Sequence, residues 1–262
     1  MAAQGHELLA AVERSPGAAA GHDRAGWVGL FTADGRVEDP VGSRPHVGHG
    51  QIGRFYDTFI GPRDIVFYRD LDVIRDHVVV RDLELGVVMG SVAMAIPAFL
   101  RYDLRQVDGE WKIAVLRAYW DLPATMLHFL RNGARAVPAT VQLSCGLVRN
   151  QRLLGTAGFA AGFRRAGSRQ KSVLAKFLSA VARADLAAAH KTISGASITL
   201  GDGELVDITE LGERLDGASW TKLIAAGSTI AVSVTAEQGR AVMFADVVGC
   251  GSRISRLRYF PA

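Results

Sequence analysis

The strongest constraint on the fold is a change of hydrophobic period after Pro62. From there to Trp120 apolar and polar residues alternate, which is typical of strands with one buried face. Asp108-Gly109-Glu110 indicates a hairpin turn near the end of this region. We expect antiparallel strands over residues 65–71, 73–81, 83–89, 94–107 and 112–120. One face of such a sheet is apolar and must be covered by helices.

Helical patterns precede the strands, at residues 7–13, 25–31 and 51–59. We expect Ser15-Pro16-Gly17 to break the first helix, His22-Asp23 to cap the second, and Gly61-Pro62 to end the third. Residues 37–39 are a short strand. Helices followed by a curved antiparallel sheet predict an α+β cone, in which the sheet wraps over the helices and leaves a pocket at its mouth.

The same order of elements returns in the second half of the chain. Its expected helices and first strand lie at residues 170–184, 185–193, 197–200 and 209–215. Leu116-Arg117-Ala118-Tyr119-Trp120 and Leu257-Arg258-Tyr259-Phe260 are similar enough to be the same terminal strand. We therefore predict a degenerate internal duplication, with two cone-shaped domains at residues 1–121 and 168–262. A chain of 262 residues is long enough for two such cores.

Residues 122–167 are predicted to be a basic helical connector. From Leu122 to Ala184 there are ten Lys and Arg residues and no Asp or Glu, so the flanking parts are net acidic. An acidic balance argues against nucleic acid as a partner of the motif-bearing half. The connector can lie on anionic lipid, dock an acidic partner, or pack between the two copies.

Two further features bear on location. The most apolar stretch of the connector, residues 153–163, is too short to span a bilayer. The N-terminus lacks the pattern of an export signal. We expect a cytoplasmic protein, with peripheral membrane contact through residues 122–184 as an open alternative.

Asp39 is the first candidate for chemistry. It lies at the end of the short strand and before Pro40-Val41-Gly42, a turn signal that holds the carboxylate at the strand end. In an apolar cone, such a carboxylate can take a proton next to a carbonyl group and return it elsewhere. The alternative is an Asp that only forms a surface turn before proline.

Several motifs in this order resemble one protein family. Residues 37–42 (Val-Glu-Asp-Pro-Val-Gly), Gly48, Phe55-Tyr56, Asp103 and residues 117–120 (Arg-Ala-Tyr-Trp) resemble the ketosteroid isomerase (steroid Δ-isomerase) branch of the nuclear-transport-factor-2-like, or SnoaL-like, superfamily. The resemblance covers roughly the first half of the chain. It implies the cone fold, a hydrophobic steroid-like ligand, and no cofactor or metal. It also implies that the two copies pack as an internal pseudo-dimer, and it leaves homo-oligomers open.

The resemblance assigns roles to two carboxyl groups. Asp39 would be the general base. Asp103 would stay protonated among apolar neighbours and donate a hydrogen bond to the developing oxyanion. For Asp103 the alternative is an ion pair with Arg101 or Arg105.

The family's other oxyanion donor is a tyrosine in an early helix, and this sequence departs from that pattern. The expected place falls near Ser15, and no tyrosine precedes Tyr56. Tyr56 matches a second tyrosine of the family and is the remaining hydroxyl candidate. The resemblance also implies an apolar pocket lining of Phe31, Met94, Phe99, Leu116 and Trp120. The alternative is that these five side chains are plain core.

In the second half, Asp202 falls near the position of the base and Asp246 near that of the late-strand acid. The motif around Asp202 has decayed to Leu-Gly-Asp-Gly-Glu, which fits a hairpin turn without catalysis. Either a second site or a structural copy is compatible with these residues.

Two further patterns have weaker support. Residues 48–53 match GxGxxG, but no buried strand and no βαβ unit surround them, so we expect no nucleotide site. His46 and His49 lack a third ligand at a suitable spacing, so we expect loop histidines and no metal.

Three functions remain open on this sequence. The first is a cofactor-independent isomerase that shifts a proton on a steroid or polycyclic ketone. The second is a tandem epoxide hydrolase or cyclase of the polyether type, which needs a second carboxylic acid from the strand after the third helix, where Asp64 and Asp70 lie at the margins. The third is a non-catalytic carrier of steroids or lipids.

Overall fold

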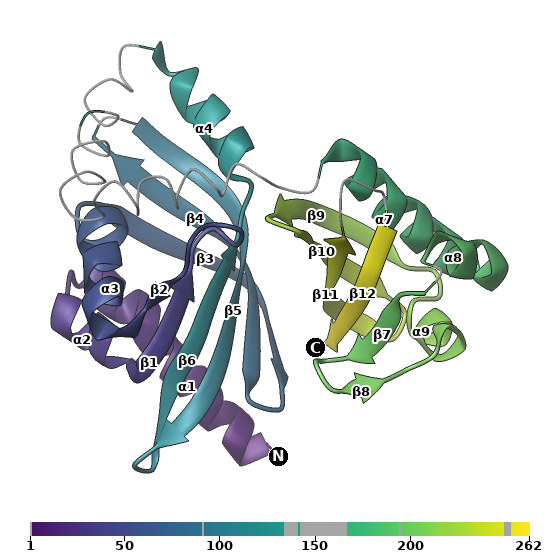
Figure 1. The fold of residues 1–262 in the computed structure, drawn as a ribbon, viewed down its shortest axis with the longest axis horizontal. Coiled ribbons are helices and arrows are strands. Elements are labelled where there is room, and N and C mark those ends of the chain that lie inside the picture. The colour runs from purple at the N-terminus through teal and green to yellow at the C-terminus, as the bar shows by residue number, and fades with distance from the viewer. Residues whose placement is uncertain (1, 91, 134–140, 142–166, 194, 249–252) are drawn as a thin grey trace. The chain divides into compact units, whose positions relative to one another are not determined.

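A computed structural model describes residues 2–90, 92–133, 141, 167–193, 195–248 and 253–262. It divides the chain into two units, Met1–Phe163 and Arg164–Ala262 (Figure 1). Each unit contains a curved six-stranded sheet with helices packed on it. The predicted α+β class, with two tandem cone-shaped domains, is therefore confirmed.

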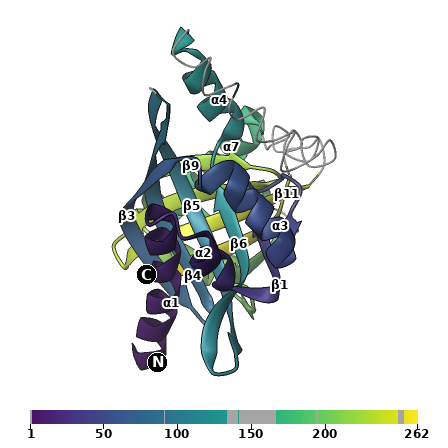
Figure 2. The ribbon, with the colours of Figure 1, turned by 90° about the vertical axis from the view of Figure 1, so that its left-hand side faces the viewer.

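The first unit begins with helices and continues with a meander. Its elements are α1 (Ala2–Ala20), α2 (Arg24–Gly29), β1 (Phe31–Glu38), β2 (His46–Val47), α3 (Gly48–Phe55), η1 (Tyr56–Ile60), β3 (Asp64–Arg75), β4 (Val78–Met89), β5 (Val92–Val107), β6 (Glu110–Tyr119) and α4 (Leu122–Leu130). The strand order is β2-β1-β6-β5-β4-β3, and β1 pairs in parallel with β6. Figure 2 shows α1, α2 and α3 on the same side of this sheet.

The first helix runs through the predicted break. Pro16 lies inside α1, which ends only at Ala20. Leu8, Val12 and Ser15 are spaced by four and three residues and are all buried on the face that packs against the core. Burial of that face offsets the cost of about 3 kcal/mol that a proline imposes inside a helix. The predicted cap of the second helix is confirmed, because Asp23 accepts a hydrogen bond from the Gly26 backbone N–H.

The meander has four long strands where five were expected. The expected strand over residues 73–81 is interrupted by a tight turn at Asp76 and His77, which joins β3 to β4. Asp76 adopts a left-handed conformation with φ of 53°, which aspartate tolerates better than most residues. The predicted turn at Asp108-Gly109 is confirmed, with φ of 52° and 82° as a type I′ hairpin requires.

The core of the first unit contains one buried ion-pair network. Arg81 of β4 donates from Nε and Nη2 to the two carboxylate oxygens of Asp72, at 2.7 and 3.0 Å. Its Nη1 donates to Glu13 Oε2 of α1 at 3.0 Å. The side chains of Arg81 and Asp72 are only 2% and 11% exposed, whereas that of Glu13 is 48% exposed. The network therefore ties α1 to the inner face of the sheet through a buried pair with one partly exposed member.

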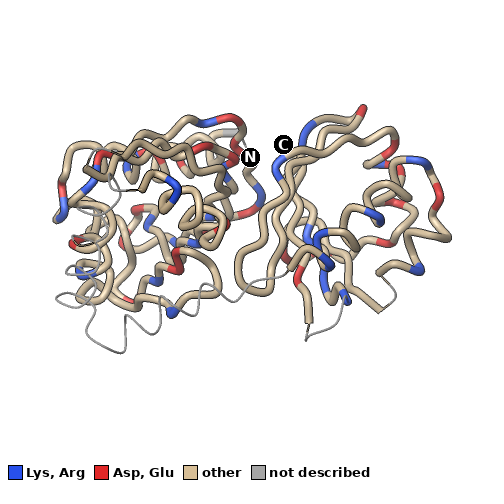
Figure 3. Tube along the Cα trace, turned by 90° about the horizontal axis from the view of Figure 1, so that it is seen from above, with Lys and Arg blue, Asp and Glu red and all other residues tan. Residues whose placement is uncertain are grey.

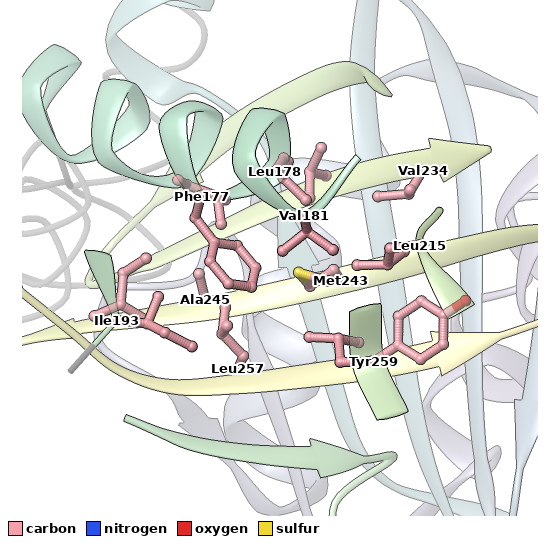
Figure 4. Close-up of a cluster of buried hydrophobic side chains, with 14 of the residues drawn as sticks. Phe177, Leu178, Val181, Ile193, Leu215, Val234, Met243, Ala245, Leu257 and Tyr259 are labelled. Atoms are coloured by element: carbon pink, nitrogen blue, oxygen red, sulfur yellow. The ribbon is translucent and has the colours of Figure 1, made fainter. Parts of the chain in front are cut away.

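The second unit repeats this architecture. Its elements are α7 (Ser168–Val181), α8 (Leu186–Thr192), β7 (Ser197–Leu200), β8 (Glu204–Leu205), α9 (Ile208–Arg214), β9 (Ser219–Ala226), β10 (Thr229–Ala236), β11 (Gly239–Val248) and β12 (Arg253–Pro261). The strand order is β8-β7-β12-β11-β10-β9, again with the first strand of the unit parallel to the last. Figure 4 shows Phe177, Leu178 and Val181 of α7 packed with sheet residues such as Met243 and Leu257.

The same cross-strand ion pair occurs within each unit and shows which residues of the two units are equivalent. In the first unit Arg117 of β6 donates to Asp103 of β5 at 2.6 Å, and a β-bulge follows Asp103. In the second unit Arg258 of β12 donates to Asp246 of β11 at 2.7 Å, and a β-bulge follows Asp246. The same strands, the same diagonal pair and the same bulge make the duplication visible residue by residue.

The predicted connector is described only in part. Its first nine residues form α4, which belongs to the first unit, where Phe129 is buried against Met94 and Trp120. Residues 134–140 and 142–166 lie outside the described residues, as does the apolar stretch 153–163. Within the described ranges no helix is long and apolar enough to cross a membrane. Acidic and basic residues are interspersed in both units (Figure 3).

Candidate functional site

An apolar cavity lies in the first unit, bounded by the sheet strands β3, β4 and β5 and by α3, η1 and α4. Its volume is about 120 Å³. A dry cavity of ~150 Å³ is known to hold one benzene molecule, so the enclosed space accommodates about one ring. Rings from Phe55, Phe59 and Trp120 form part of its wall.

Asp39, the first candidate from the sequence, is among the residues that line this cavity. It follows the last residue of β1, and the Pro40-Val41-Gly42 turn holds it there, because Ser43 N donates to Pro40 O and Gly42 has the φ of 95° that this turn requires. The parallel pairing of β1 with β6 brings the end of β6 alongside. Trp120, directly after β6, donates from Nε1 to Asp39 Oδ1 at 2.6 Å.

The surroundings of Asp39 disfavour its charge. Burial raises the pKa of the Asp39 carboxyl to about 6, and the hydrogen bond from Trp120 offsets part of that rise. The group keeps some accessible surface because it faces the cavity. A carboxylate of this kind is ionised at neutral pH and accepts a proton more readily than an exposed one does.

Arg63 is a second charged residue at the cavity, and the sequence did not predict it. It follows η1 and precedes β3, and its Nη1 donates to the Thr58 carbonyl at 2.7 Å. Its guanidinium lies 5.9 Å from the centre of the Phe59 ring. Burial lowers the pKa of Arg63 from its ordinary value. An arginine side chain stays charged in proteins.

The predicted apolar lining is right in part. Met94 and Trp120 line the cavity. Phe31 and Leu116 lie in the core beneath the helices, and Phe99 is buried elsewhere, so none of these three is among the described lining residues. For them the alternative of plain core is correct.

The remaining aliphatic wall comes from alternate residues of neighbouring strands, which sequence reasoning missed. It consists of Ile65, Leu85, Val87, Met89 and Ile96. Leu85 pairs with Ile96 and Val87 with Met94 across β4 and β5, so all four share one face. The alternation of apolar residues along both strands is the sequence pattern that could have identified this wall. Thr125 and Met126 of α4 complete the wall.

Asp103 does not have the surroundings that its predicted role requires, which is a correction. It accepts hydrogen bonds from Arg101 Nε at 2.7 Å and from Arg117 Nη1 at 2.6 Å. Its neighbours Leu100, Tyr102 and Leu104 point into the core, so Asp103 lies on the opposite face of β5 and is not among the described lining residues. Asp103 is therefore part of an ion-pair network, and the ion-pair alternative holds for Arg101, with Arg117 as the second partner in place of Arg105.

The tyrosine candidate is also displaced from the cavity. Tyr56 is buried against Trp27, with ring centroids 5.6 Å apart, and it is not among the described lining residues. Its hydroxyl has no hydrogen-bond partner in the described part of the chain. At the expected place of the family's early tyrosine, Ser15 is buried and accepts a hydrogen bond from Trp27 Nε1 at 3.1 Å.

The histidines of the loop are structural in this arrangement. His46 packs on Phe55 with ring centroids 5.1 Å apart, and burial lowers its pKa to about 4. His49 Nε2 lies 3.0 Å from the Phe31 carbonyl oxygen. The glycine motif of residues 48–53 lies within α3 and is helical from Gly48 onward, where a loop leading into a helix was expected. Among the described residues there is no group of three side chains suited to a metal ion.

The second unit does not repeat the carboxylate. Arg117 pairs with Glu38 and Arg258 with Thr199, so the residue equivalent to Asp39 is Leu200, which is buried. Asp202 lies beyond it in a turn, with its side chain 39% exposed.

The second unit also lacks the residue that donates to that carboxylate in the first unit. By the same register Pro261 replaces Trp120, and Tyr259 replaces Ala118. Asp246 is held by Arg258 and by the Thr229 hydroxyl at 2.8 Å, which explains it as a structural residue.

Residues 7–93 match the family model of the nuclear transport factor 2 (NTF2) domain. The first unit is therefore an NTF2-like domain, which confirms the predicted superfamily, and the second unit repeats its architecture. A search of curated proteins finds no match to the sequence.

Three solved structures similar to this chain illustrate the range of its relatives. RV0760c from Mycobacterium tuberculosis is 24% identical, with 45% of this chain and 92% of that chain covered and a TM-score of 0.41. The Δ5-3-ketosteroid isomerase from Mycobacterium sp. is 26% identical, with 45% and 95% covered and a TM-score of 0.40. The epoxide hydrolase/cyclase-like enzyme SalBIII is 18% identical, with 45% and 93% covered and a TM-score of 0.40.

Proposed function

We propose that the first unit, an NTF2-like domain, binds an apolar carbonyl compound and moves a proton on it, with Asp39 as the general base. One observation carries this proposal. The Asp39 carboxylate faces an apolar cavity and is held there by the 2.6 Å hydrogen bond from Trp120. Its pKa of about 6 suits a base that works near neutral pH, because the group is ionised beforehand and still binds the proton long enough to return it.

The reaction is a proton shift on a β,γ-unsaturated ketone. Asp39 takes a proton from the carbon between the carbonyl group and the double bond, and the electron pair moves to the carbonyl oxygen as a dienolate. The protonated Asp39 then gives the proton to the far carbon of the former double bond, and the conjugated ketone results. Thr125, a hydroxyl in the cavity wall, is a neutral donor available to the carbonyl oxygen.

The size of the cavity limits what reacts there. A volume of about 120 Å³ takes a single ring. A four-ring steroid would place its reactive ring inside and extend out of the cavity. We therefore propose a reactive part of one ring, whatever the size of the whole substrate.

The test uses a one-ring substrate. Cyclohex-3-en-1-one isomerises to cyclohex-2-en-1-one by this proton shift, and the conjugated product is followed by its ultraviolet absorbance. We expect Asp39→Asn to lower kcat by about 100-fold or more, as loss of a general base does. The control is Asp64→Asn, since the Asp64 side chain is 78% exposed. Retained turnover in Asp39→Asn would exclude the base role.

Non-catalytic binding of an apolar ligand is the second candidate. It is favoured by one observation, namely that neither Asp103 nor Tyr56 is among the described residues lining the cavity, so the family's oxyanion donors are not in place. Binding of a phenol by wild-type protein without turnover of the ketone would select this candidate.

The cyclase hypothesis has less support. It needs a second carboxylic acid from the strand after the helix, and that strand contributes Ile65 to the cavity. Asp64 and Asp70 are exposed and are not among the described lining residues.

A further inference from the structure

Arg63 is the unusual member of the cavity wall. The other residues that line the cavity are apolar, with the exception of Asp39 and Thr125. Trp120 adds a ring N–H, but this group already donates to Asp39. A guanidinium group has five N–H donors in a planar fork. Among the described residues, one of them is used, in the hydrogen bond to the Thr58 carbonyl.

Among the described residues, the charge of Arg63 has no counterion. No described Asp or Glu forms an ion pair with it, and Asp39 is held by Trp120 instead. The residues outside the described ranges contain no Asp or Glu in their sequence. A half-buried cation in an apolar wall costs solvation energy, and such charges are normally paired. The missing anion is therefore expected to come from a ligand.

We propose that this cavity selects apolar molecules that carry a carboxylate, and that Arg63 binds this carboxylate. The proposal rests on the proposed function for the identity of the site and names the class of molecule that enters it. A single guanidinium matches a monoanion in charge, and its planar fork matches the two oxygens of a carboxylate.

The position of Arg63 orients such a molecule. Its neighbours Pro62 and Asp64 are exposed and Arg63 itself is half-buried, so the guanidinium lies where the cavity meets the surface. The aliphatic residues Leu85 and Ile96 line the same cavity and offer no partner to a charged group. An amphiphile would therefore enter with its apolar end first and leave its carboxylate near the mouth, at Arg63.

The experiment compares three probes with the same chain: decanoate, decan-1-ol and decyl phosphate. Their dissociation constants are measured by isothermal titration calorimetry on the full-length protein at pH 7.5, where decanoate is ionised. The variants are Arg63→Gln, which removes the charge, and Arg63→Lys, which keeps it without the fork. The control is Arg44→Gln, which removes an exposed arginine of the loop between β1 and β2. Thermal unfolding confirms that each variant is folded.

We expect wild type and Arg44→Gln to bind decanoate about tenfold more tightly than decan-1-ol, the gain of one charge-assisted pair. Arg63→Gln should lose this preference while still binding the alcohol, and Arg63→Lys should keep part of it. The proposal is overturned if Arg63→Gln keeps the preference, if wild type shows none or binds no probe, or if decyl phosphate binds more tightly than decanoate. Because no step here needs Asp39, inactivity in the ketone assay would leave this result intact, so the two proposals fail separately.

Discussion

Trp120 and Asp39 are 81 positions apart in the sequence and are joined by a hydrogen bond of 2.6 Å from Nε1 to Oδ1. The contact depends on the parallel pairing of β1 with β6, which places the two strand ends side by side. Trp120 therefore does two things at once. Its ring closes part of the apolar wall, and its N–H stabilises the charged form of the base.

Replacing Trp120 by phenylalanine separates these two effects. Trp120→Phe keeps an aromatic wall and removes the hydrogen bond, so the pKa of Asp39 should rise above its present value of about 6. Activity should fall roughly tenfold at pH 6, where more of the base is protonated, and much less at pH 8. The measurement is the midpoint of the pH profile of kcat/KM in the ketone assay. Trp111→Phe, which removes an indole bonded to Glu7, should leave the midpoint unchanged.

The burial that suits Asp39 to its proposed role as a base should also destabilise the first unit. The folded pKa of about 6 lies above the ordinary value of 3.8, so the folded state holds a proton that the unfolded state has lost between these two pH values. Stability from this group is therefore present at low pH and is lost as pH rises through 6. The ionised form should cost about 3 kcal/mol above that pH.

Asp39→Asn should consequently be more stable than wild type at pH 8 and no more stable at pH 4. Asparagine is nearly isosteric and keeps an oxygen for Trp120 to donate to, while it removes the buried charge. Urea unfolding at both pH values measures the difference in the free energy of unfolding. An equal difference at the two pH values would show that the effect is packing rather than charge.

Much of the fold was predictable because its signals are local. Asp23 caps α2 with a side chain three residues from the N–H it accepts, and Asp108-Gly109 sets its own turn. The failures are non-local. Pro16 stays inside α1 because burial of one helix face outweighs the local penalty, and no pattern around Pro16 reports that burial.

The site shows the same limit. Alternation along β5 places Phe99 and Asp103 on one face and Leu100 and Tyr102 on the other, and both faces contain large apolar residues. Which face the helices cover is decided by the packing of α1 and α2, so the sequence could not tell that Asp103 lies on the other side. Arg63 was missed for a related reason, since an arginine after a helix ordinarily faces solvent.

Arg81 should be the most sensitive charged residue of the first unit. Arg81→Met leaves Asp72 without its bidentate partner, and the Asp72 side chain is only 11% exposed. Breaking a buried pair from one side typically costs ~3–5 kcal/mol. Thermal unfolding should show a fall of roughly 10 °C in Tm.

Two variants test whether this loss comes from the stranded carboxylate of Asp72. Arg69→Met removes an arginine that also bonds Glu13 but is 52% exposed, and it should cost no more than about 1 kcal/mol. Adding Asp72→Asn to Arg81→Met should recover part of the loss. If it recovers none, the packing of the Arg81 side chain is the larger contribution.

The second unit should contribute no proton transfer. Its register puts Leu200 where the first unit has Asp39 and Pro261 where it has Trp120, so the second unit lacks both the proposed base and its hydrogen-bond donor. Asp202→Asn should therefore leave kcat within about twofold of wild type, since its side chain is 39% exposed in a turn and lies beyond the position equivalent to Asp39. Asp246→Asn should also leave kcat unchanged but lower the free energy of unfolding by about 1 kcal/mol, because it weakens the bonds from Arg258 and Thr229. The decisive comparison is Asp39→Asn with and without Asp202→Asn. Residual turnover that disappears only in the double variant would mean that the second unit retains a working base. The alignment of Leu200 with Asp39 would then be wrong.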